Sequence, residues 1–219
     1  MNRRTLLIGA SALGVVAFGG GAFFLNRQRQ AEAEAVAAAT PAVDPSLLIR
    51  PHSPSFGPAD APVTLVEFFD PSCEACRAFH PTVMEIKKQF PTQVRVVLRY
   101  TVFHEGSDEA VRILEVARMQ DKFENVLNAL LEKQPAWALH DGPDMALAWR
   151  VAGAVGLDLK KAESDRLFPG ITGVLNQDAA DVQAVGINKT PTFFLNGKEL
   201  INLSPESLIA EVKAAVEIV

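Results

Sequence analysis

Cys73 and Cys76 are the two cysteines of the chain, and two residues separate them. A pair at this spacing forms a structural disulfide, contributes to a metal site, or acts as a reactive dithiol. The run Val63 to Phe69 before the pair is nearly continuous in apolar residues and has the length of a buried strand, and a helix is predicted to begin near Glu74. Cys73 therefore falls at the first turn of a helix, where unpaired backbone N–H groups and the helix dipole stabilise a thiolate.

The two less reactive interpretations have weaker support. A disulfide between residues three apart closes a loop of about four residues, which stabilises a chain by only about 2 kcal/mol in the chain-entropy model. A structural zinc site usually needs four ligands; His80 and His104 could join the cysteines, but the sequence offers no second cysteine pair. The reactive interpretation assigns attack to Cys73, and the more buried Cys76 resolves the mixed disulfide.

Two segments together resemble a known family. They are Val63 to His80, which contains Cys73-Glu74-Ala75-Cys76, and Thr190-Pro191-Thr192-Phe193-Phe194-Leu195-Asn196-Gly197. The chain resembles the DsbA-like group of thioredoxin-fold thiol:disulfide oxidoreductases over residues 46–219. The resemblance implies an α/β, thioredoxin-like fold with an inserted α-helical subdomain. It also implies disulfide exchange with cysteine-containing protein substrates, and no cofactor beyond the redox-active pair itself.

The resemblance assigns a role to each matching position. It makes Cys73 the nucleophile, Cys76 the resolving thiol and Glu67 a buried acid that moves protons to or from the second cysteine. A carboxyl in an apolar strand is costly without a partner or a role, which also singles out Glu67, although an edge position facing water is an alternative. Pro191 matches a cis-proline opposite the cysteines, and the backbone of Thr190 is expected to pair with an extended substrate peptide.

The residues between the cysteines depart from the strongly oxidising members, which have Pro-His where this chain has Glu74-Ala75. Without a histidine, and with the negative charge of Glu74 nearby, we expect a higher Cys73 pKa and a weaker oxidant. Thr190 is a residue that members with isomerase or reductase roles share. The direction of electron flow thus stays open between oxidase, reductase and isomerase, and a non-catalytic metal-binding or adaptor module on the same fold is a further alternative.

The rest of the chain supplies the scaffold. Apolar residues at helical spacing, as in Phe123 to Leu131, predict a helical insertion at about residues 104–185. Asn196-Gly197 between two strand-like runs predicts a hairpin, because both central residues of a type I′ turn need positive φ. Ser204-Pro205 predicts the start of a last helix. The proline- and glycine-containing stretch Pro51 to Pro62 leads into the strand-like run that begins at Val63.

The N-terminal residues predict export. Residues 1–29 contain an uncharged run over residues 5–26, which is longer than the apolar core of a cleaved signal peptide and favours an uncleaved membrane anchor. Ala-x-Ala sites permit cleavage as the alternative, and residues 30–45 are expected to be an alanine-rich linker. We expect a periplasmic or extracytoplasmic domain, tethered to the cytoplasmic membrane and served by a membrane redox partner.

Charge argues against another class of partner. The formal net charge is −5, and four of the 21 basic residues but only two of the 26 acidic residues precede Thr40, which leaves −7 for the remainder. An acidic domain of this kind is not suited to nucleic acid. No metal site is predicted.

Overall fold

The computed structural model describes Arg27 and residues 43–218. The predicted anchor over residues 5–26, and all but Arg27 and the last three residues of the segments 1–29 and 30–45, lie outside the described residues. Among the helices described here, none is both long and apolar enough to cross a membrane. All further description concerns residues 43–218.

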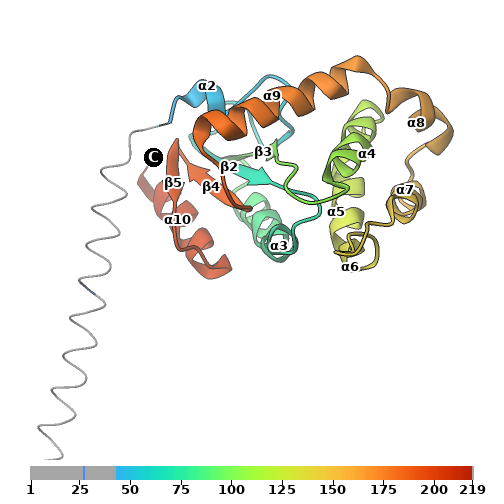
Figure 1. Cartoon of the computed structure of the whole chain (residues 1–219). Helices are drawn as coiled ribbons and strands as arrows, with labels where there is room; N and C mark the ends of the chain where they lie inside the picture. Colours follow the sequence, from blue (N-terminus) through green and yellow to red (C-terminus); the bar gives the residue numbers. More distant parts are fainter. Residues whose placement is uncertain (1–26, 28–42, 219) are drawn as a thin grey trace, which may run out of the picture. The chain divides into compact units, whose positions relative to one another are not determined.

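Five strands form one mixed sheet in the order β1-β3-β2-β4-β5 (Figure 1). β2 (Val63–Phe69) and β3 (Val94–Tyr100) run parallel at its centre, and β4 (Thr192–Leu195) pairs antiparallel with β2. β5 (Lys198–Leu200) pairs with β4 through a turn in which both central residues have positive φ, as the hairpin prediction required. β2 is thus a central strand with a neighbour on each side.

β1 (Ser55–Phe56) is a strand that was not predicted from the sequence. These two residues pair antiparallel with Val96 and Val97 of β3 and form one edge of the sheet. A two-residue strand is too short to show the alternation of apolar and polar residues by which strands are recognised.

Helices cover both faces of the sheet (Figure 1). α3 and α10 pack on one face and α2 and α9 on the other, while the segment between β3 and β4 carries the helical insertion from α4 to α9. This is the α/β fold with a helical insertion that the resemblance implied. The helices are α2 (Pro45–Leu48), α3 (Glu74–Gln89), α4 (Ser107–Met119), α5 (Phe123–Glu132), α6 (Gln134–Trp137), α7 (Met145–Ala154), α8 (Leu159–Asp165), α9 (Pro169–Val185) and α10 (Pro205–Ile218).

The alternation of side chains along β2 decides which face each residue serves. Val66 and Phe68 pack with Val97, Phe194 and residues of α2 and α9. Leu65 and Phe69 pack with the cysteines and α3 in the larger core. Because successive side chains of a strand point to opposite faces, Glu67 points to the same side as Leu65 and Phe69, toward the cysteines.

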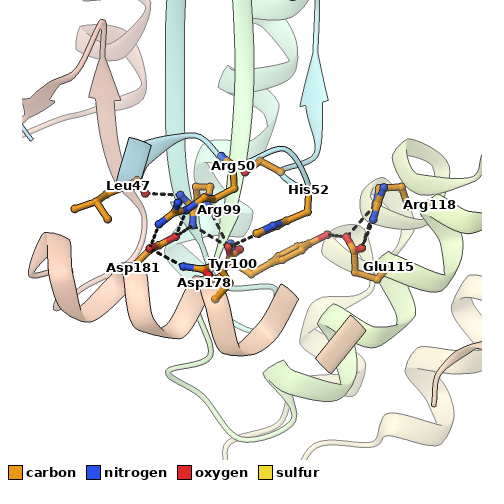
Figure 2. Close-up of polar contacts among 11 residues, drawn as sticks. Leu47, Arg50, His52, Arg99, Tyr100, Glu115, Arg118, Asp178 and Asp181 are labelled. Atoms are coloured by element: carbon orange, nitrogen blue, oxygen red, sulfur yellow. Dashed lines mark hydrogen bonds and ion pairs between the residues drawn. The ribbon is translucent and has the colours of Figure 1, made fainter. Parts of the chain in front are cut away.

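A buried ionic cluster joins α2, β3 and α9 on the other face (Figure 2). The Arg99 guanidinium is fully buried and donates to Asp178 at 2.8 Å and to Asp181 at 2.6 Å. Arg50 donates two further bonds to Asp181, and His52 Nε2 lies 2.7 Å from Asp178 Oδ1. Basic groups near the start of the described chain are thus paired with acids of α9, which holds the segment after the predicted linker against the sheet and α9.

Tyr100 extends the polar contacts toward the insertion (Figure 2). Its backbone N–H donates to Asp178 Oδ2, and its hydroxyl donates to Glu115 at 2.9 Å. Glu115 on α4 also accepts from the Arg118 guanidinium. Burial, and then the charge of Glu115, raise the pKa of Tyr100, so its hydroxyl stays a proton donor.

Candidate active site

The two cysteines lie where β2 passes into α3. Cys73 is the N-cap residue of α3 and has extended backbone angles, and Cys76 follows in the first turn. Both are free thiols and both are buried, Cys73 at 7% exposure and Cys76 at 1%. Cys73 is the one that an incoming sulfur reaches first.

The environment separates the acidities of the two thiols. The pKa of Cys73 is lowered to about 5, chiefly by a hydrogen bond from the Cys76 side chain, against the effect of burial. A side-chain hydrogen bond from Thr190 and the backbone N–H groups of Cys76 and Ala75 lower it further. The pKa of Cys76 is raised far above its usual range by burial first, then by its bond to Cys73 and by the charges of Glu67 and Cys73. At neutral pH the pair therefore consists of a Cys73 thiolate and a Cys76 thiol.

Glu67 is 3% exposed in the central strand β2, which excludes the edge position facing water. Burial, and then the charge of Cys73, raise the pKa of Glu67 to about 8. The charge of Glu67 in turn raises the pKa of Cys76. A carboxyl with this pKa holds its proton at neutral pH and can exchange it with a nearby group.

Thr190 and Pro191 lie on the other side of Cys73. Their peptide bond is cis, and Cys73 Sγ lies 3.3 Å from the Thr190 carbonyl oxygen, to which Cys73 donates when it is protonated. A pocket of about 210 Å³ adjoins Pro191. It is lined by Phe79, Lys189, Pro191, Thr192, Phe193, Glu199, Leu200, Asn202 and Leu203. The Thr190-Pro191 segment thus adjoins both the Cys73 sulfur and a pocket lined by apolar and polar side chains.

Asp70 was missed at the sequence level, although it directly follows β2. Its carboxylate is fully buried and accepts from the backbone N–H groups of Ser72, Phe103 and His104 and from the Ser107 hydroxyl. Its own N–H donates to Cys76 Sγ at 3.5 Å. Asp70 therefore holds the loop before the cysteines against the loop that starts the insertion. A carboxyl at the end of a buried strand was the available signal.

The two histidines near the cysteines have local partners. His104 Nδ1 lies 2.9 Å from Asp70 Oδ2, which makes His104 part of this loop anchor. His80 Nε2 lies 2.7 Å from Asn128 Oδ1 on α5, and burial lowers the pKa of His80. Within residues 43–218 and Arg27, no group of three or more His, Cys, Asp or Glu side chains is arranged to hold a metal ion.

Gln134 on α6 was also missed, and no pattern in the sequence marks it. It is 1% exposed, and its side-chain amide donates to the carbonyl oxygens of Pro71 at 2.8 Å and Cys73 at 3.0 Å. Its own oxygen accepts from Arg77 Nε at 3.0 Å. A residue of the insertion thus contacts the backbone on both sides of Ser72, next to the reactive cysteine.

Comparison with known proteins shows the family of the chain. Residues 50–214 match the family model described as Thioredoxin. The chain belongs to this thioredoxin family. A solved thioredoxin-like oxidoreductase from Silicibacter pomeroyi DSS-3 is 29% identical, with a TM-score of 0.68, over 81% of this chain and 99% of that chain. BdbD from Bacillus subtilis, in its oxidised form, shares the fold with 24% identity and a TM-score of 0.66, over 75% of this chain and 93% of that chain.

The thioredoxin-family domain also resembles part of much longer proteins. A sodium/proton antiporter, NhaA 1 of Mycobacterium sp. (strain KMS), is 31% identical over 160 residues, which are 69% of this chain and 25% of the antiporter. NhaA of Herminiimonas arsenicoxydans is 29% identical over 71% of this chain and 25% of its own length. The chain spans about a quarter of the length of these curated relatives, so the likeness is confined to one domain-sized segment of each.

Proposed function

We propose that the protein is a thiol:disulfide oxidoreductase that exchanges disulfides with cysteine-containing proteins through Cys73 and Cys76. The observation that carries the proposal is the opposite displacement of the two thiol pKa values, with Cys73 at about 5 and Cys76 far above its usual range. A stable thiolate at the accessible position makes a good nucleophile and leaving group, and a protonated thiol behind it waits for the resolving step.

In the oxidising direction, a client thiolate attacks Cys73 Sγ of the Cys73–Cys76 disulfide. The bond between the two cysteines breaks, Cys76 departs as a thiolate, and Glu67 supplies the proton that this buried sulfur requires. A second client thiolate then attacks the client sulfur of the mixed disulfide and expels the Cys73 thiolate. The client gains a disulfide, and the pair is reduced by two electrons.

In the reducing direction, the same groups act in reverse order. The Cys73 thiolate attacks a client disulfide and releases one client sulfur as a thiolate. Glu67, in its ionised form, takes the proton from Cys76, whose sulfur attacks Cys73 and frees the second client sulfur. In both directions Thr190 and Pro191 hold the client chain, with the Thr190 backbone pairing to an extended peptide.

The setting of this reaction belongs to the same proposal. The uncharged run over residues 5–26 supports a periplasmic or extracytoplasmic domain tethered to the cytoplasmic membrane, where disulfides persist. A membrane redox partner then restores the pair after each exchange, and the Cys73–Cys76 disulfide serves in place of a bound cofactor. Reductase or isomerase activity remains the alternative direction.

The experiment is a redox titration of the full chain in detergent against glutathione, with the protein thiols counted at each ratio. A potential near −120 mV identifies a disulfide donor, and one near −270 mV identifies a reductant or isomerase. Glu74-Ala75 leads us to expect a value below that of the strong oxidants. C73S abolishes exchange, and C76S accumulates mixed disulfides at Cys73. Failure of the wild-type pair to cycle contradicts the proposal.

A further inference from the structure

We call residues 70–76, from the end of β2 to Cys76, the redox loop. The helical insertion contacts this loop through Gln134, whose amide donates to the carbonyl oxygens of Pro71 and Cys73. We propose that Gln134 is a positioning residue that holds the backbone of Pro71 and Cys73, so that the insertion sets the reactivity of the redox pair. This inference rests on the proposed function, since it concerns the same cysteines. It assigns to one buried side chain a role that the CxxC motif does not contain.

The orientation of the Gln134 amide is fixed by its third contact. Arg77 Nε donates to Gln134 Oε1 at 3.0 Å, and a guanidinium has no acceptor, so the amide oxygen faces Arg77. The amide nitrogen then faces the two carbonyls and has one N–H for each. Arg77 lies one helical turn after Cys73, and its backbone N–H donates to the Cys73 carbonyl oxygen at 3.1 Å. Gln134 and Arg77 together hold the first turn of α3.

This arrangement bears on the thiolate because backbone geometry stabilises it. The N–H groups of Ala75 and Cys76 lower the Cys73 pKa only while they point at Cys73 Sγ. Their direction depends on the backbone angles of residues 71–73, which the Gln134 amide fixes at two carbonyls. The amide also offsets the partial negative charge of the Cys73 carbonyl oxygen, which belongs to the same residue as the thiolate.

The position of Gln134 depends in turn on the packing of the insertion. α6 begins with Gln134 and ends with Trp137, which is fully buried and donates from Nε1 to the Leu130 carbonyl on α5 at 2.8 Å. α6 is therefore fastened to α5, and α5 packs its apolar face on the core. A change in how the insertion packs reaches the redox loop through this amide.

The test is Gln134→Met, which keeps a long unbranched side chain and removes the amide. We expect the Cys73 pKa, followed by the far-ultraviolet absorbance of the thiolate across pH, to rise by about one unit, a tenfold loss of acidity. A less stable thiolate means a less stable reduced form, so the equilibrium with glutathione shifts about tenfold toward the disulfide. That shift corresponds to a potential about 30 mV more reducing.

Two further variants separate positioning from general loss of stability. Tyr100→Phe removes another buried hydrogen bond, to Glu115, and should lower stability while leaving the Cys73 pKa unchanged. Arg77→Met frees the orientation of the amide without deleting it, and should raise the Cys73 pKa by less than Gln134→Met. This variant also keeps the inference testable if Gln134→Met does not fold.

The outcomes distinguish this inference from the proposed function. If Gln134→Met or, where that variant does not fold, Arg77→Met lowers stability as Tyr100→Phe does while the Cys73 pKa and the potential stay at wild-type values, the inference is wrong, although exchange continues. If the wild-type pair fails to cycle with glutathione or client thiols, the proposed function is wrong. The pKa comparison among the variants then still decides the role of Gln134.

Discussion

Glu67 and Asp181 are both carboxyl groups with almost no exposed surface. Glu67 lies in the sheet and points to the face covered by α3, and Asp181 lies on α9, which packs on the other face. The pKa of Glu67 is raised to about 8 by burial and by the charge of Cys73. The pKa of Asp181 is lowered to about 2, first by its hydrogen bonds from Arg50 and then, against burial, by the hydrogen bond from Arg99. Burial alone therefore does not decide the charge of a carboxyl group; its partners do.

The opposite pKa shifts of Glu67 and Asp181 reflect two different surroundings, the cysteine pair and the ionic cluster. In the ionic cluster of Arg50, His52, Arg99, Asp178 and Asp181, each acid lies against basic side chains. At the redox loop, Glu67 and Cys76 are buried with groups that raise their pKa values, so both hold protons that they can exchange. The buried groups with raised pKa values thus lie beside Cys73, where the proposed exchange requires proton transfer.

Breaking the ionic cluster should give the largest effect. Arg99→Met leaves Asp178 and Asp181 buried with one fewer cation, which we expect to lower the free energy of unfolding by about 3–5 kcal/mol. Urea denaturation measures the loss. The Cys73 pKa should not move, because the cluster lies on the other face of the sheet. A loss of under about 1 kcal/mol would mean that Arg50 and His52 suffice to pair the two acids.

Replacing Glu67 should raise stability at high pH, whereas Arg99→Met lowers it. Its folded pKa of about 8 lies above the ordinary value of 4.5, so the native state retains a proton that the unfolded chain releases. The stability of reduced wild-type protein therefore falls as pH rises from about 4.5 to 8, by about 1.4 kcal/mol per unit of pKa shift at most. We expect Glu67→Gln to be the more stable protein at pH 8 and no more stable at pH 4.

The same Glu67→Gln variant tests proton transfer. Resolution of a mixed disulfide at Cys73 should slow by about 10²-fold, because Cys76 loses its proton acceptor. Rapid mixing with a disulfide-bonded peptide, followed by acid quenching, measures this step. An unchanged rate assigns the proton transfer to solvent.

Asp181 should change the pH dependence of stability less than Glu67 does, and in the opposite sense, because its pKa is lowered and not raised. Its folded pKa of about 2 lies below the ordinary value of 3.8, so its contribution to stability is present above about pH 4 and is lost as pH falls toward 2. Asp181→Asn should flatten the fall in unfolding free energy over this window. Denaturation at half-unit steps from pH 2 to 5 compares the two proteins, and equal slopes would place the acid sensitivity elsewhere.

Glu74 should give the smallest effect. Its side chain is largely exposed at the start of α3, so Glu74→Gln should lower the Cys73 pKa by only a few tenths of a unit, and less at 1 M salt. The thiolate absorbance titration used for Gln134→Met, repeated at low salt and at 1 M salt, measures the Cys73 pKa under both conditions. A fall larger than the rise caused by Gln134→Met would make the residues between the cysteines, and not the insertion, the main determinant of Cys73 acidity.

Local sequence patterns predicted much of the scaffold. The apolar run of β2 and the turn residues Asn196 and Gly197 identify their elements because strand burial and turn angles depend on neighbouring residues. The edge strand β1 was not predicted, because two residues carry too little pattern. Asp70 was visible in principle as a carboxyl after a buried strand, but its partners come from a loop more than thirty residues away.

The sequence by itself determined that two cysteines stand at the start of a helix and predicted the order in which they react, because the position of Cys73 before a helix is a local property of the chain. Tertiary structure decided what surrounds that pair. Gln134 lies 63 residues from Pro71, and Arg99 lies 79 residues from Asp178, yet each pair is in hydrogen-bond contact. Neither contact leaves a local pattern, because each depends on how separate elements pack and on which polar groups that packing removes from water.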